Sequence, residues 1–141
     1  MTNETRKISG YILLSIPTII YGGYFLLTVL SGQQEQLQLT DFQKSMFRAG
    51  HAHAGVLVIL ALLIQLFVDH TTLSKNWKWV ARFSFPTSAI IISLGFFAAA
   101  IGSQITESTR LIFILYIGVG ILTFGLLTLG IGLIRKKKGC P

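Results

Sequence analysis

Two histidines, His51 and His53, are the side chains in this sequence that are best suited to chemistry. An imidazole can ligate iron, copper or zinc, and it can also move a proton near neutral pH. On a helix, side chains at positions i and i+2 point about 200° apart, so we expect these two rings to face different neighbours. Small residues surround both rings and leave space for a flat group, namely Gly50, Ala52, Ala54 and Gly55.

A porphyrin is a flat group of this kind, and haem iron is commonly held by histidine. We therefore expect haem b as the cofactor, with His51 and His53 as candidate ligands. Arg48 and Arg110 are predicted at the same membrane surface, where a guanidinium can pair with a haem propionate. The sequence does not identify a second axial ligand.

The stretch that carries the two histidines, FRAGHAHAG from Phe47 to Gly55, resembles a helix of the haem-copper oxidase subunit I superfamily. In that helix a His-x-His pair serves two haems from opposite faces. The stretch is also similar to the His-Ala-His segment of haem- and copper-containing membrane proteins linked to the nitric oxide response. The resemblance implies that His51 and His53 each ligate a haem iron or a neighbouring metal. A complete oxygen-reducing centre is not expected, because the other histidines of the large oxidases have no counterpart here.

Two alternatives remain open from the residues alone. In the first, His51, His53 and Glu107 bind a non-haem metal, for which Cu, Fe or Zn are suitable, and the protein is a metal-dependent membrane oxidoreductase. In the second, the histidines only hydrogen-bond to neighbouring helices, and the chain is a non-catalytic subunit or scaffold of a membrane complex.

Four apolar segments position these side chains, at residues 8–30, 47–68, 79–103 and 111–134. Each is long enough to cross a bilayer, which needs roughly 20 apolar residues. Hydrophobic residues make up 52% of the chain, and the mean hydropathy is +0.67. We expect one all-α membrane domain over residues 1–141, folded as an antiparallel four-helix bundle.

The distribution of Lys and Arg predicts the orientation of this bundle in the cell membrane. Nine of these residues flank one side of the four segments and three flank the other. Cytoplasmic loops carry the excess of positive charge, so both termini are predicted in the cytoplasm. The nine are Arg6, Lys7, Lys75, Lys78, Arg82 and the four residues 135–138, and the three are Lys44, Arg48 and Arg110. The two histidines then lie near the outer surface.

Several residues predict details of packing. Thr40 and Gln43 have the spacing of a capping box, which predicts a helix start near Asp41. Gln65 is expected to hydrogen-bond between helices, and Asp69 with His70 to form an exposed end of the second span. Glycines recur every seven positions in the fourth span and predict a close helix contact: Gly118, Gly125 and Gly132.

The sequence also excludes several classes of protein. It contains no phosphate-binding glycine loop, no paired cysteine motif and no His-Glu-x-x-His motif, so neither nucleotide use nor hydrolysis of soluble substrates is expected. Nucleic acid is not expected as a partner either, because the basic residues cluster between apolar runs, which is typical of a protein in a bilayer. The expected partners are the lipid bilayer and either a second copy or a larger membrane complex. The expected function is electron transfer, or the handling of oxygen-derived or diatomic species at the outer face, which includes the activity of an oxidoreductase. The residues do not identify a substrate or an electron donor.

Overall fold

The computed structural model describes residues 1–32 and 38–135 and contains four long α-helices. They are α1 (Asn3–Leu30), α2 (Asp41–Asp69), α3 (Lys75–Ala99) and α4 (Phe113–Ile134), and a short 3-10 helix, η1 (Arg110–Ile112), precedes α4. All four long helices are apolar and long enough to cross a membrane. The prediction of an all-α protein with four candidate spans is confirmed. Residues 136–138, which contributed to the predicted orientation, lie outside the described residues.

The helix ends agree with the sequence pattern at one position and differ at another. Helix α2 begins after Thr40 with the predicted capping box, in which Thr40 and Gln43 exchange side-chain-to-backbone hydrogen bonds. Helix α3 ends at Ala99 and not at residue 103 as predicted. In the connection that follows, Gly102 adopts a φ of 134°, a conformation that side-chain-bearing residues rarely reach.

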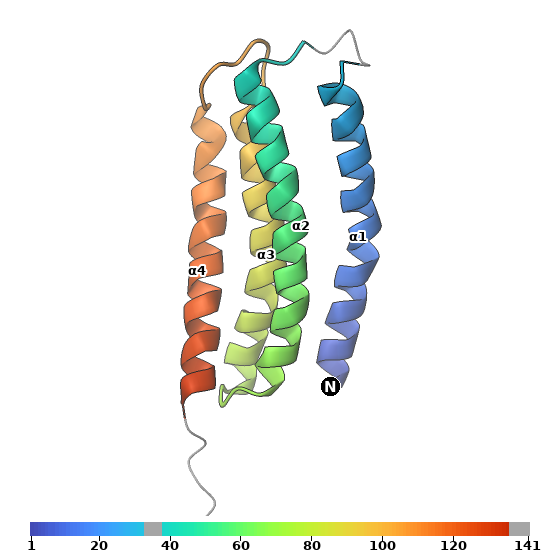
Figure 1. The fold of residues 1–141 in the computed structure, drawn as a ribbon. Helices are drawn as coiled ribbons and strands as arrows, with labels where there is room; N and C mark the ends of the chain where they lie inside the picture. Colours follow the sequence, from blue (N-terminus) through green and yellow to red (C-terminus); the bar gives the residue numbers. More distant parts are fainter. Residues whose placement is uncertain (33–37, 136–141) are drawn as a thin grey trace, which may run out of the picture.

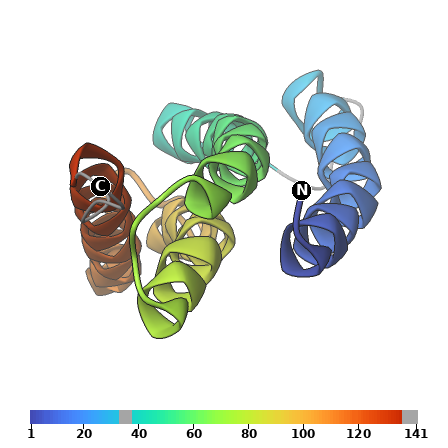
Figure 2. The ribbon, with the colours of Figure 1, turned by 90° about the horizontal axis from the view of Figure 1, so that it is seen from below.

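Helix α3 is the central element of the bundle, and α1 lies at its margin (Figures 1 and 2). Helix α3 packs against α2 on one side and α4 on the other, whereas α1 packs mainly against α2. Half of the most apolar stretch of α3 is buried (50%), compared with 11% for α1 and for α4. Figure 1 places the N-terminus, the α2–α3 connection and the last residues of α4 at one end, which we call the N-terminal end.

Glycines allow α4 to approach α3 closely, as their spacing predicted. Gly118, Gly125 and Gly132 are all buried. A Cβ atom at Gly118 would lie 2.7 Å from the Ile92 side chain, and one at Gly125 would collide with Ser84. Direct backbone approach of this kind is a common basis for helix association in lipid, where apolar burial supplies little driving force.

A polar cluster with a buried centre connects α1, α2 and α3 at the N-terminal end. We call Thr2, Thr5, Gln65, Asp69 and Arg82 the Arg82 cluster. Arg82 is only 4% exposed and donates hydrogen bonds to Asp69 (2.5 Å), Thr5 (2.7 Å) and Gln65 (3.2 Å). Gln65 makes the predicted interhelical bond, because its amide donates to the Arg82 carbonyl at 3.1 Å.

The prediction of an exposed Asp69 at the end of the second span is wrong. The Asp69 side chain is 15% exposed, because it pairs with Arg82 and accepts a hydrogen bond from the Thr2 backbone N–H at 3.1 Å. Its neighbour His70 is exposed, as predicted. Arg82 therefore does not contribute a solvent-facing charge to the N-terminal end, because its charge is compensated inside the bundle.

Candidate functional site

Helix α2 directs His51 toward α1, where the imidazole lies directly against the backbone of Gly23. A Cβ atom built on Gly23 would lie 2.7 Å from Nε2 of His51 and 2.9 Å from its Cε1. Any side chain at this position would therefore displace the ring. The adjacent glycines at positions 22 and 23 are visible in the sequence, but only the packing shows that Gly23 faces His51.

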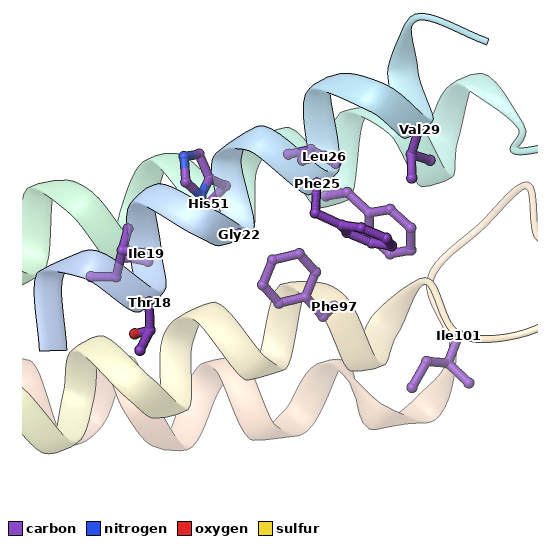
Figure 3. Close-up of a pocket in the computed structure, with 11 residues that line it drawn as sticks. Thr18, Ile19, Gly22, Phe25, Leu26, Val29, His51, Phe97 and Ile101 are labelled. Carbon is purple, nitrogen blue, oxygen red and sulfur yellow. The ribbon is translucent and has the colours of Figure 1, made fainter. Parts of the chain in front are cut away.

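His51 also forms part of the wall of an apolar pocket of about 400 Å³ in the half of the bundle opposite the N-terminal end. Figure 3 shows His51 beside the stretch of α1 that contains Gly22, and Phe97 of α3 extends toward α1. Among the described residues that line the pocket, only His51 and Thr18 have polar side chains. The remaining lining residues are Ile19, Gly22, Phe25, Leu26 and Val29 of α1, Phe47 and Ala54 of α2, and Phe97 and Ile101.

His53 lies on a different face of α2 from His51, as the i, i+2 spacing predicted. Its side chain is exposed, and its ring packs against Phe96 of α3 with a centroid distance of 4.7 Å. The Nδ1 atom lies 2.8 Å from the Ala49 carbonyl oxygen, which can only accept, so Nδ1 carries the hydrogen. In the neutral ring, Nε2 therefore carries a lone pair that can accept a hydrogen bond or bind a metal. His53 does not line the pocket that His51 lines.

The other predicted site residues are exposed and none of them lines the pocket. Arg48 lies one turn before His51 on α2, whereas Arg110 begins η1, which packs on α3 and α4. Glu107 is exposed in the connection between α3 and η1. Within residues 1–32 and 38–135, no three His, Cys, Asp or Glu side chains are close enough to hold a metal ion together. A metal centre of His51, His53 and Glu107 is therefore not preassembled in the described part of one chain.

Two features of the structure, one in this pocket and one at the N-terminal end, were not evident from the sequence. Phe97 forms the α3 wall of the pocket, but it is one of ten phenylalanines and no spacing distinguishes it. The Arg82 cluster was missed because Asp69 and Arg82 are separated by a turn of the chain and appear as ordinary charges flanking two spans.

Comparison of the chain with family models, curated proteins and solved structures found no match. The fold and composition alone define the class: this is a multi-pass membrane protein of four candidate spans.

Proposed function

We propose that this chain is a small haem-binding protein of the cell membrane that handles a diatomic or oxygen-derived species or transfers electrons. The observation that supports the proposal is a single imidazole, His51, in the wall of an otherwise apolar pocket between three helices. An ionisable side chain within a membrane-spanning helix is expensive to keep there, which favours a functional role.

We place both termini of an antiparallel bundle in the cytoplasm and the His51 pocket in the outer half of the membrane. Apart from Arg82, which pairs with Asp69, five described Lys and Arg residues lie at the N-terminal end and three at the other. Residues 136–138 add three lysines after α4. Both tryptophans, Trp77 and Trp79, are near the start of α3, where indoles commonly sit at the interface.

The residues that line the pocket suit a haem in their chemistry. Cofactor pockets usually have volumes of about 300–1,000 Å³ and mostly apolar walls, and this one has about 400 Å³. In the present packing Nε2 of His51 faces Gly23, so ligation requires the ring to turn from α1 into the pocket. Gly22 lines the pocket on the α1 side without a side chain, and α1 is the helix with the fewest packing partners.

When bound, the haem would supply an iron centre for one-electron chemistry or diatomic binding. His51 would hold the iron, and Phe97 together with the aliphatic wall would exclude water. Arg48, on the same side of α2 as His51, would pair with a propionate. Arg110 is a less direct candidate, because η1 lies on the α3–α4 side of the bundle.

The placement of the three histidines favours a haem that binds a diatomic ligand over an electron-transfer haem held by two imidazoles. Only His51 lines the pocket, while His53 lies on another face of α2 and His70 lies at the N-terminal end. A haem in this pocket would have one protein imidazole, unless His53 of a second copy contributed the other. A haem held by a single protein side chain could also bind a diatomic ligand.

An optical spectrum of the detergent-purified, haem-supplemented protein tests the proposal. We expect a Soret band and a carbon monoxide difference spectrum, both lost in His51→Ala and both retained in the matched variant His53→Ala. Gly23→Val should change haem affinity because it displaces the His51 ring from α1, whereas Gly10→Val, on the same helix and with no atom within 4 Å of its Cβ, should leave the affinity unchanged. A protein that takes up no haem, or equal losses in the two histidine variants, would contradict the proposal.

The tight contact between His51 and Gly23 favours a second candidate, a non-catalytic membrane subunit in which the imidazole only packs against α1. In that case the purified protein is colourless, and His51→Ala lowers stability without any spectral change. Metal analysis of the same sample then tests a non-haem oxidoreductase with Cu, Fe or Zn. Such a metal would have to draw ligands from a second chain or from rearranged helices, since the described residues contain no three-ligand group.

A further inference from the structure

A second, larger groove lies between α1 and α3 at the N-terminal end and has a volume of about 830 Å³. Its walls are mainly aromatic and aliphatic and include Tyr11 of α1 with Trp79, Phe83 and Ile90 of α3. The groove exists because α1 packs mainly on α2 and leaves its side toward α3 uncovered.

The groove has the length of one lipid leaflet. From Trp79 to Ile90 it follows α3 for about 16 Å at 1.5 Å rise per residue. Half of a hydrocarbon core of about 30 Å is nearly the same length. A partner helix that crossed the membrane would need a face twice as long, so the dimensions favour an acyl chain.

Positive charge collects only at the end of the groove that lies at the membrane surface. Lys7 lines the groove, and Lys75 and Lys78 line an adjoining polar cavity of about 310 Å³. Among the described residues, no carboxylate lies within ion-pair distance of these three lysines. Two acids are nearby: Glu4 borders both cavities, and Asp69 borders the polar one but is paired with Arg82 at 2.5 Å. Three ammonium groups therefore face one uncompensated carboxylate.

We propose that this groove binds one anionic phospholipid, with an acyl chain between α1 and α3 and its phosphate at Lys7, Lys75 and Lys78. Basic pockets between membrane helices attract anionic headgroups, and each nearby lysine contributes about 1 kcal/mol. Trp79 lies at the boundary between the apolar and the charged part, where an indole can contact both. The proposal is independent of the haem site, which lies in the other half of the bundle.

The chain carries a built-in reporter and its control, because it has only two tryptophans. Trp79 lines the groove and stacks on Phe83 with a centroid distance of 5.4 Å. Trp77 faces α4 instead, with its ring centroid 6.1 Å from that of Phe124. The variant Trp77→Phe reports only on the groove, and Trp79→Phe reports only on the other face at nearly the same depth.

Both variants are reconstituted in phosphatidylcholine vesicles that contain either brominated phosphatidylglycerol or brominated phosphatidylcholine as quencher. We expect the Trp79 reporter to be quenched preferentially by the brominated anionic lipid, and the Trp77 reporter to be quenched equally by both. In the Trp79 reporter, Lys7→Gln and Lys78→Gln should each lower the relative association constant of the anionic lipid about fivefold. Lys44→Gln, at the opposite end, should leave it unchanged.

Equal quenching of Trp79 by the two brominated lipids would overturn the proposal. The same anionic preference at Trp77 would also overturn it, because it would show a general accumulation of anionic lipid around the basic end. If a lysine variant does not fold, the quenching of the Trp79 reporter without a lysine substitution is measured at increasing salt concentration instead. A specific headgroup contact predicts that this preference falls as salt screens the lysines.

Discussion

The Arg82 cluster should be the main polar contribution to the stability of the bundle, and Arg82→Met tests this directly. The variant keeps an unbranched side chain but removes the donors to Asp69, Thr5 and Gln65. Removing one partner of a buried ion pair costs about 3–5 kcal/mol, because the other charge stays buried. Asp69 would still accept hydrogen bonds from Thr2 and Thr5, so we expect the lower end of that range, about 3 kcal/mol.

The assay is unfolding of the purified protein by SDS in mixed detergent micelles, followed by tryptophan fluorescence and circular dichroism. The comparison needs Arg82→Met, Asp69→Leu and the double variant. Because the double variant buries no unpaired charge, it should be more stable than Arg82→Met alone. A loss below about 1 kcal/mol in Arg82→Met, as for a surface ion pair, would refute this reasoning. The reasoning would also be refuted if the double variant lost as much free energy of unfolding as the two single variants together.

Two further predictions concern helix contacts and helix ends; size-exclusion chromatography tests the first, and the same unfolding assay tests the second. Gly125→Leu should separate α4 from α3 and abolish a monodisperse folded protein, because its Cβ would collide with Ser84. The control Gly130→Leu has no atom within 4 Å of its Cβ and should fold normally. Equal behaviour of the two glycine variants would contradict the close α3–α4 contact. Thr40→Ala should lower the free energy of unfolding by about 1 kcal/mol through loss of the capping box. The exposed control Ser45→Ala should change it little, and an unchanged Thr40→Ala would show that this cap is energetically unimportant.

The sequence by itself determined the helical elements and some of their details. Four apolar runs of spanning length predict four helices, because backbone polar groups within a bilayer must be paired inside each segment. The start of α2 was predictable from Thr40 and Gln43, because a capping box is a local interaction. The divergence of His51 and His53 followed from helix geometry alone.

Only the tertiary structure decided which helix faces each of these side chains. Gly23 meets His51 because α1 packs on α2 at that height, and no local pattern in either helix specifies that register. Asp69 and Arg82 pair because the end of α2 and the start of α3 bring them together beside Thr2 and Thr5 of α1. Helical periodicity tells which residues share a face, but the rotation and height of each helix against its neighbours depend on long-range packing of small and polar residues. The pocket of His51 and the groove of Trp79 result from that packing.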